Sequence, residues 1–107
     1  MNKKRMSQME RKMVQIQEAL GRIGPMRPGS LTRQYRNPKD RTGAYWQLSY
    51  TRRMKSHTEY VRPEWVPEIR RQIAAYKRLM GLIDRWINLS IERSKLQMRI
   101  AKQVGSK

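Results

Sequence analysis

The longest stretch of helical pattern in this 107-residue sequence lies between Pro67 and Gly105. Proline is absent from its interior, and apolar residues recur three or four positions apart in its first half: Ile69, Ile73, Tyr76, Met80, Ile83 and Ile87. This spacing places the apolar side chains on one face of a helix. Pro67 suits a first helical turn, and Glu64 and Glu68 favour the positive end of the helix dipole. The pattern predicts one long helix over residues 67–103.

A second amphipathic helix is predicted over residues 3–23. Its apolar residues also lie three or four positions apart, at Met6, Met9, Met13, Ile16, Leu20 and Ile23. Gly24 and Pro25 stop this helix, because Gly accepts the left-handed conformation after a helix end and Pro cannot extend the helix. We expect the apolar face to fill a core, with a partner-binding surface as the alternative.

The two predicted helices differ in length, so they cannot cover each other completely. If they pair antiparallel, residue 23 lies near residue 67 and the start of the shorter helix lies near residue 88. Residues 90–103 then have no intramolecular partner. Ile91 and Met98 in this overhang are candidates for a contact with a second copy or another chain. A frayed tail is the alternative interpretation.

Three strands are predicted between the helices. Residues 24–30 hold two Pro and two Gly and read as a linker. The stretches SLTRQYR, AYWQLSYT and SHTEYV then alternate in strand fashion, and the face of Trp46, Leu48 and Tyr50 belongs against a helix. A β-meander over 31–62 is followed by a turn at 63–66. The predicted fold class is α+β: an N-terminal helix, a three-stranded antiparallel β-meander and a long C-terminal helix pairing antiparallel with the first, in a single small domain of residues 1–107.

The balance of charge indicates the kind of partner. Lys and Arg number 25 against 8 Asp and Glu, which leaves a formal net charge of +17. Repulsion on that scale disfavours a compact monomer without counter-charge, so we expect a polyanion as partner. Nucleic acid is favoured over a membrane, because no apolar run approaches the ~20 residues of a spanning helix and no signal-peptide pattern opens the chain.

Cysteine and histidine usage argues against several chemistries. The sequence has no Cys and one His, His57. We therefore expect no metal site, no thiolate chemistry and no cofactor. The lack of Cys fits a reducing cytoplasm. Tyr60 beside His57 is the one candidate nucleophile, but we favour Tyr60 packed in the sheet, His57 at the surface and no catalytic residues.

The stretch SYTRRMKSHTEY, residues 49–60, places Arg52, Arg53 and Lys55 where a hairpin should turn. A tight two-residue turn needs positive φ at its centre, which Gly and Asn adopt far more easily than Arg, Met or Lys. We therefore expect a longer loop, ordered by its ligand, whose cations contact phosphate. A merely solvated cluster of charges is the alternative.

Cations alternate with aromatic and amide side chains throughout residues 33–62. Arg and Lys neutralise phosphates, whereas Gln47 offers an amide for base edges or sugar hydroxyls. The predicted nucleic-acid-binding residues are Arg33, Arg36, Lys39, Arg41, Gln47, Arg52, Arg53, Lys55, His57 and Arg62.

Four short stretches resemble a family of small, poorly characterised bacterial and archaeal proteins described only as a domain of unknown function: PGSL at 28–31, GAYWQLSY at 43–50, TEYV at 58–61 and VPEIRRQIAAYKRLMGLID at 66–84. The resemblance covers residues 28–90 and implies the strand and helix framework, with a link to DNA or RNA and to mobile elements. Relatives carry a Cys-rich knuckle where this chain has RNPKDRTG, so no zinc ligands carry over.

Three functions follow as expectations. The first is a non-catalytic DNA-binding protein of a mobile element or phage, with a homodimer as a candidate assembly. The second is a small RNA-binding subunit of a ribonucleoprotein, either RNA-guided or ribosomal. The third is a helical protein-interaction module whose charge supports solubility.

Overall fold

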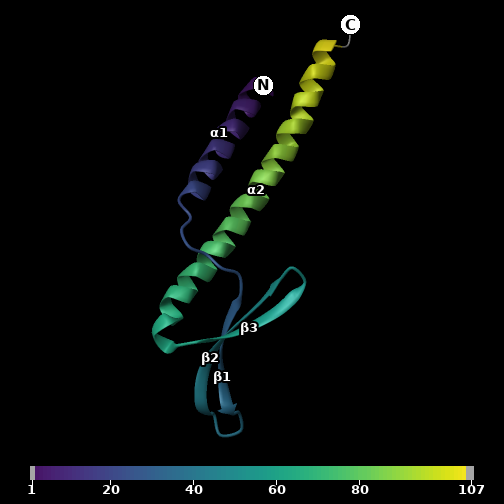
Figure 1. Ribbon diagram of the computed structural model, residues 1–107. Coiled ribbons are helices and arrows are strands. Elements are labelled where there is room, and N and C mark those ends of the chain that lie inside the picture. The colour runs from purple at the N-terminus through teal and green to yellow at the C-terminus, as the bar shows by residue number, and fades with distance from the viewer. Residues whose placement is uncertain (1, 106–107) are drawn as a thin grey trace. The chain divides into compact units, whose positions relative to one another are not determined.

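The computed structural model describes residues 2–105 and contains two long helices and one sheet (Figure 1). The expected α+β class is confirmed. In chain order the elements are α1 (Asn2–Gly21), β1 (Ser30–Asn37), β2 (Thr42–Arg52), β3 (Lys55–Val61), the 3-10 helix η1 (Pro63–Trp65) and α2 (Val66–Gly105). None of the helices within residues 2–105 combines the length and apolar character needed to cross a lipid bilayer.

The chain divides into two compact units that share α2. The sheet unit, Gly24–Arg78, contains the linker, the three strands and the first part of α2. The helical unit contains α1 and the part of α2 from Leu79 onward. The first part of α2 therefore belongs with the sheet, and the rest of α2 belongs with α1.

The sheet unit is an antiparallel sheet of order β1-β2-β3, covered on one face by the first part of α2. Its core consists of Leu48, Val61, Val66 and Ile73, with Leu31, Trp46, Tyr50 and Ile69 packed against it. Leu48, at the centre of the middle strand, has no exposed surface. The predicted contact of the Trp46, Leu48 and Tyr50 face with a helix is therefore confirmed.

Arg27 fixes the linker to the sheet unit. Its backbone N–H donates to the carbonyl oxygen of Gln72 at 3.2 Å, and its guanidinium lies 3.0 Å from the carboxylate of Glu59. The guanidinium also lies 5.1 Å from the centre of the Tyr50 ring, and the Tyr50 hydroxyl donates to Glu59 at 3.0 Å. The hydrogen bond from Arg27 lowers the pKa of Glu59, so this carboxylate stays charged. Its negative charge is paired with Arg27 inside the sheet unit.

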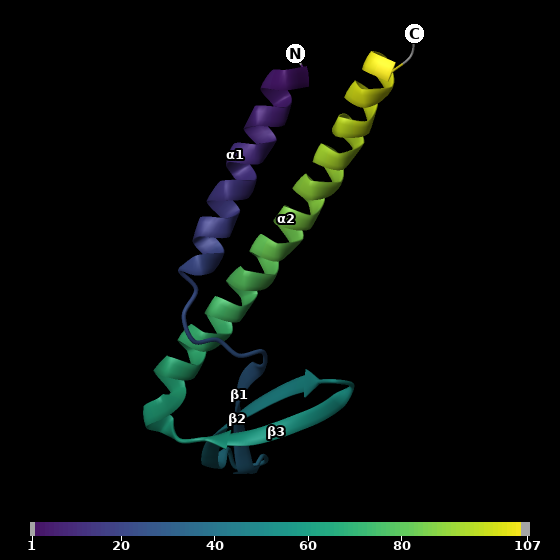
Figure 2. The ribbon, with the colours of Figure 1, turned by 45° about the horizontal axis from the view of Figure 1, so that its top comes forward.

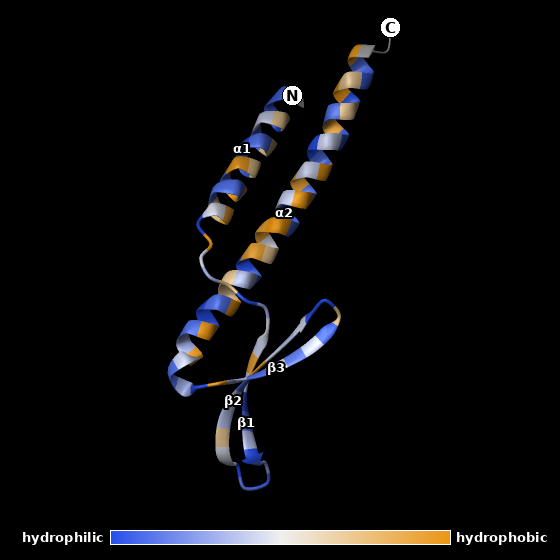
Figure 3. Cartoon of the chain, viewed as in Figure 1, coloured by the Kyte–Doolittle hydropathy of each residue, from blue (hydrophilic) through white to orange (hydrophobic). Residues whose placement is uncertain are grey.

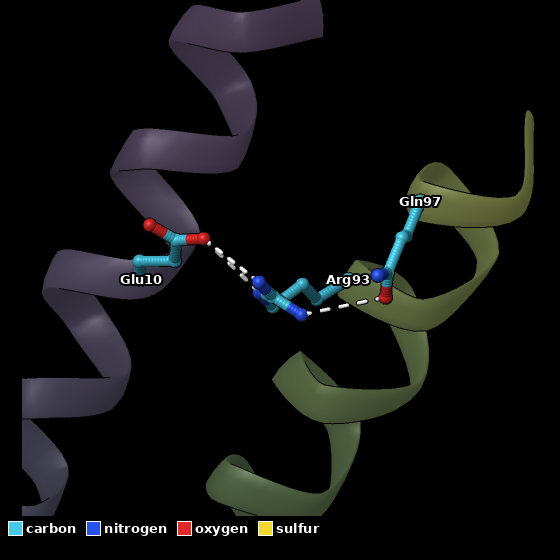
Figure 4. A network of polar contacts seen from close by, with 3 residues as sticks. All are labelled: Glu10, Arg93 and Gln97. Carbon is cyan, nitrogen blue, oxygen red and sulfur yellow. Dashed lines mark hydrogen bonds and ion pairs between the residues drawn. The ribbon is translucent and has the colours of Figure 1, made fainter. Parts of the chain in front are cut away.

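In the helical unit, α1 lies antiparallel to the second part of α2 (Figure 2). Four side chains of this unit are buried: Met9 and Ile16 on α1, and Leu82 and Leu96 on α2. Arg93 donates to the carboxylate of Glu10 at 2.9 Å and to the amide oxygen of Gln97 at 3.5 Å (Figure 4). The predicted antiparallel pairing of the two helices is confirmed.

The predicted register of the two helices is wrong. It would place residue 10 near residue 81, whereas Glu10 pairs with Arg93. Residues 90–103 are therefore not an overhang without a partner. The shift arises because Val66, Ile69 and Ile73, at the start of α2, pack on the sheet and are not available to α1.

The predicted apolar face of α2 also changes along the helix. Ile69 and Ile73 pack in the sheet unit as expected, but Met80 and Ile87 are about half exposed. Leu82 and Leu96 are the buried residues in the helical unit. Ile91 and Met98 remain exposed, although Arg93 in the same part of α2 pairs with Glu10 of α1.

Candidate nucleic-acid interface

The turn between β2 and β3 is a tight two-residue turn. Arg52 pairs with Lys55 at the end of the ladder, which leaves only Arg53 and Met54 to reverse the chain. Their φ angles are 52° and 66°. Two positive φ angles define a type I′ turn, whose right-handed twist matches that of the flanking strands. The expected longer loop is therefore wrong.

Arg53 and Met54 both adopt the left-handed conformation in this turn, although neither is Gly or Asn. The left-handed region costs a non-Gly residue roughly 1–2 kcal/mol. Packing does not offset this cost, because Arg53 is exposed and Met54 is 98% exposed. Strained backbone that local packing does not explain is concentrated at functional sites. The strained backbone of the β2–β3 turn, which carries Arg53, therefore lowers the stability of the fold.

We predict that the double substitution Arg53→Asn and Met54→Gly stabilises the protein by about 1–2 kcal/mol, because Asn-Gly adopts a type I′ turn without strain. The urea midpoint of unfolding should rise. The control pair, Arg52→Asn with Lys55→Gly, changes the flanking strand positions and should lower the midpoint. An unchanged or lower midpoint for the turn variant would show that the turn is not strained.

The turn between β1 and β2 lies at the other end of β2 and is longer, with four residues between the paired positions. It joins the paired residues Asn37 and Thr42 and carries Lys39 and Arg41. Arg41 also has a positive φ, 52°. Figure 3 shows mostly hydrophilic residues at both turns. Because β2 has 11 residues, the two turns lie about 33 Å apart along the strand, too far to hold the same phosphate.

The cations of the sheet have few internal partners. Eight of them are exposed: Arg33, Arg36, Lys39, Arg41, Arg52, Arg53, Lys55 and Arg62. None of the eight forms an ion pair within the described residues 2–105. Glu59 is engaged by Arg27, so Asp40 is the one carboxylate left in residues 30–62. The charge of this surface is thus available to an external anion.

The predicted site residues do not converge on one point. Lys39 and Arg41 lie in one turn, and Arg52, Arg53 and Lys55 lie in or beside the other. Strand pairing places Arg36 and Gln47 on the face away from α2, and Arg33 and His57 on the face that carries Leu48. Arg62 follows the end of β3. The candidate interface therefore comprises two basic turns and the sheet surface between them.

His57 and Tyr60 lie on opposite faces of β3, because residues three positions apart in a strand alternate sides. His57 stacks on the Tyr50 ring, with centres 4.9 Å apart. Tyr60 is 63% exposed and lies 6.5 Å from the Tyr45 ring on the other face. The two side chains cannot act together as nucleophile and base. The expectation that His57 lies at the surface is confirmed, whereas the packed position expected for Tyr60 is wrong.

Sequence reasoning missed three residues of this region. Arg27 was not recognised as the residue that holds the linker, since its partners lie far away in the sequence. Tyr45 and Tyr60 were not identified as neighbours. Their alternation with the core residues Trp46 and Val61 was the available signal.

No group of three His, Cys, Asp or Glu side chains within residues 2–105 is placed to hold a metal ion. The family model described as "Domain of unknown function (DUF6788)" matches residues 3–71, more than half of the chain. The chain belongs to this family. The DUF6788 match begins in α1 and ends in the first part of α2, so it starts and stops earlier than the expected range 28–90. No curated protein and no solved structure is significantly similar to this DUF6788 chain.

Proposed function

We propose that this chain is a non-catalytic nucleic-acid-binding protein whose basic hairpin turns contact phosphates. The observation that carries this proposal is the β2–β3 turn: Arg53 lies in its strained backbone, Arg52 and Lys55 flank it, and none of these three exposed cations has a carboxylate partner among residues 2–105. Arg suits this task because its guanidinium binds phosphate oxygens through two parallel hydrogen bonds.

The whole chain supports the same partner class. The formal charge of +17 already includes all eight carboxylates, and three of these, Glu10, Glu59 and Glu68, each pair with an arginine within residues 2–105. Most cations therefore remain uncompensated. Phosphates supply the missing counter-charge, and the released counterions add a favourable entropy. As part of this proposal, the lack of Cys favours the cytoplasm as location.

Two polymers are candidates. DNA of a mobile element or phage is the first, on the resemblance described above. RNA of a ribonucleoprotein is the second, and one observation favours it: the sheet face away from α2 is rich in hydroxyl and amide groups, which can meet the 2′-hydroxyls of RNA. Competition between duplex DNA and structured RNA of equal length separates the two.

A protein partner is a further candidate, on a different observation. Seven residues of α2, most of them apolar or small, line a shallow groove: Trp86, Ile87, Ser90, Ile91, Ser94, Lys95 and Met98. A second copy or another helix could cover Ile91 and Met98, either alongside nucleic-acid binding or as the main function. A protein-interaction module without a nucleic-acid role predicts no salt-dependent binding of nucleic acid.

We predict that affinity for nucleic acid falls steeply with salt concentration. Each phosphate contact on duplex DNA adds about −0.9 to the slope of log K against log salt. Contacts from both basic turns should therefore give a slope steeper than about −3, measured by fluorescence anisotropy with a labelled oligonucleotide. A shallower slope would argue against a polyanion as the partner.

A further inference from the structure

The sheet face away from α2, which we call the open face, has an unusual composition. It is formed by alternate residues of β1, β2 and β3, from Ser30 to Arg36, from Gly43 to Thr51 and from Ser56 to Tyr60. At these positions there is no carboxylate and no Val, Ile, Leu or Met. The available groups are hydroxyls, amides, aromatic rings and a guanidinium, which can form hydrogen bonds and stack on other rings.

Two tyrosines lie side by side on the open face. Tyr60 pairs with Gln47 across the strands, so Tyr45, two positions from Gln47, is its diagonal neighbour. The ring centres are 6.5 Å apart, with the ring planes at 37°. Tyr60 is 63% exposed, so its ring surface is largely available to a ligand. Gly43 adds no side chain beside Tyr45, and its φ of 69° disfavours other residues there.

Cations border these rings. Arg36 lies on the open face, and Gly43 approaches it so closely that an added Cβ would lie 3.0 Å from the Cβ of Arg36. Arg62 has extended backbone, with φ −64° and ψ 143°, so the alternation of β3 continues and places it on the same side as Tyr60. The ladder ends with the pair of Trp46 and Val61, and Arg62 follows Val61 directly, at the end of β3 near Tyr45. The open face thus offers aromatic rings with a cation close by.

We propose that the open face binds unpaired RNA. Tyr45 and Tyr60 stack on two bases, Arg36 and Arg62 contact the adjoining phosphates, and Gln47 and the neighbouring hydroxyl groups meet the 2′-hydroxyls. Bases must be unpaired to stack on aromatic side chains, which excludes a regular duplex at this face. This inference rests on the proposed function that the sheet unit binds nucleic acid. It adds that the nucleic acid is single-stranded and that its sugar is ribose.

The test compares three labelled probes of about twelve nucleotides: oligouridine, an abasic RNA strand with the same number of phosphates, and oligodeoxythymidine. The parent protein should bind oligouridine at least about tenfold more tightly than the abasic strand, because stacking is lost when the bases are removed. It should also prefer oligouridine to oligodeoxythymidine, since only RNA presents the 2′-hydroxyl.

Two double variants test whether the rings of Tyr45 and Tyr60 stack on the bases. Tyr45→Leu with Tyr60→Leu should lower affinity for oligouridine by about tenfold or more and leave affinity for the abasic strand unchanged. Tyr45→Phe with Tyr60→Phe keeps both rings and should bind oligouridine almost as the parent does. If the leucine variant fails to fold, as judged by circular dichroism, the comparison of oligouridine with the abasic strand in the parent still decides the stacking claim.

The outcomes separate this inference from the proposed function. Equal, salt-dependent binding of oligouridine and the abasic strand would overturn the stacking claim and leave phosphate binding intact. Full oligouridine affinity in a folded leucine variant would overturn the role of the two tyrosines. Equal affinity for the RNA and DNA strands would overturn the choice of RNA. Absence of binding to all three probes and to duplex DNA would overturn both proposals.

Discussion

Replacing Ile16 with aspartate should destabilise the helical unit by about 4 kcal/mol or more, through loss of a buried aliphatic side chain and burial of an unpaired charge. Ile16, on α1, is only 3% exposed. The expected result is a large fall in melting temperature and loss of helical signal in circular dichroism.

Val14→Asp is the matched control for this substitution. Val14 lies on the same helix, two positions away, and is 50% exposed. The new charge there stays in water, so the melting temperature should change little. Similar melting temperatures for the two variants would mean that α1 does not pack through Ile16 in solution. Its apolar face would then be a surface for a partner.

The triple substitution of Arg52, Arg53 and Lys55 with serine should reduce nucleic-acid affinity sharply and leave thermal stability nearly unchanged. The three side chains are exposed, and exposed charges contribute roughly 0–1 kcal/mol each to stability. Removing the repulsion among these three cations offsets part of any stability that is lost. Loss of their phosphate contacts should make the salt slope shallower by about one unit per contact.

The response of different sequences to this triple variant identifies the kind of contact. Equal losses on all oligonucleotides would indicate that the β2–β3 turn positions the backbone through phosphates. A changed sequence preference would indicate that one of the three side chains contacts base edges. Binding as tight as that of the parent would show that this turn is not a nucleic-acid contact.

Much of the fold could be predicted from local pattern. The alternation around Leu48 identified both the middle strand and its buried face, because a half-buried strand exposes every second residue. The two helices were likewise predicted within about two residues at each end. These features depend on neighbouring residues, which the sequence shows directly.

The pairing of the helices could not be predicted in the same way. A repeating apolar pattern can slide along its partner and still bury apolar side chains, so periodicity alone leaves the register open. The observed register depends on which part of α2 the sheet occupies, and on the contact between Glu10 and Arg93. Both are long-range features of the fold.

The geometry of the candidate interface could not be predicted from the sequence. Arg53 and Met54 have poor propensity for a type I′ turn, so local preference pointed to a loop. The strong pairing of β2 with β3 up to Arg52 and Lys55 overrides that preference. The neighbouring positions of Tyr45 and Tyr60 follow from this same strand register.

The most direct test of the central claim is the difference in salt slope between two triple variants of equal charge. The control replaces Lys95, Arg99 and Lys102, which lie together on the surface of α2, with serine. If the sheet contacts phosphates, the variant of Arg52, Arg53 and Lys55 should have a slope shallower than the parent's by about two to three units, while the control keeps nearly the parent's slope. Equal changes of slope and affinity in both variants would contradict the account, because net charge alone would then explain binding.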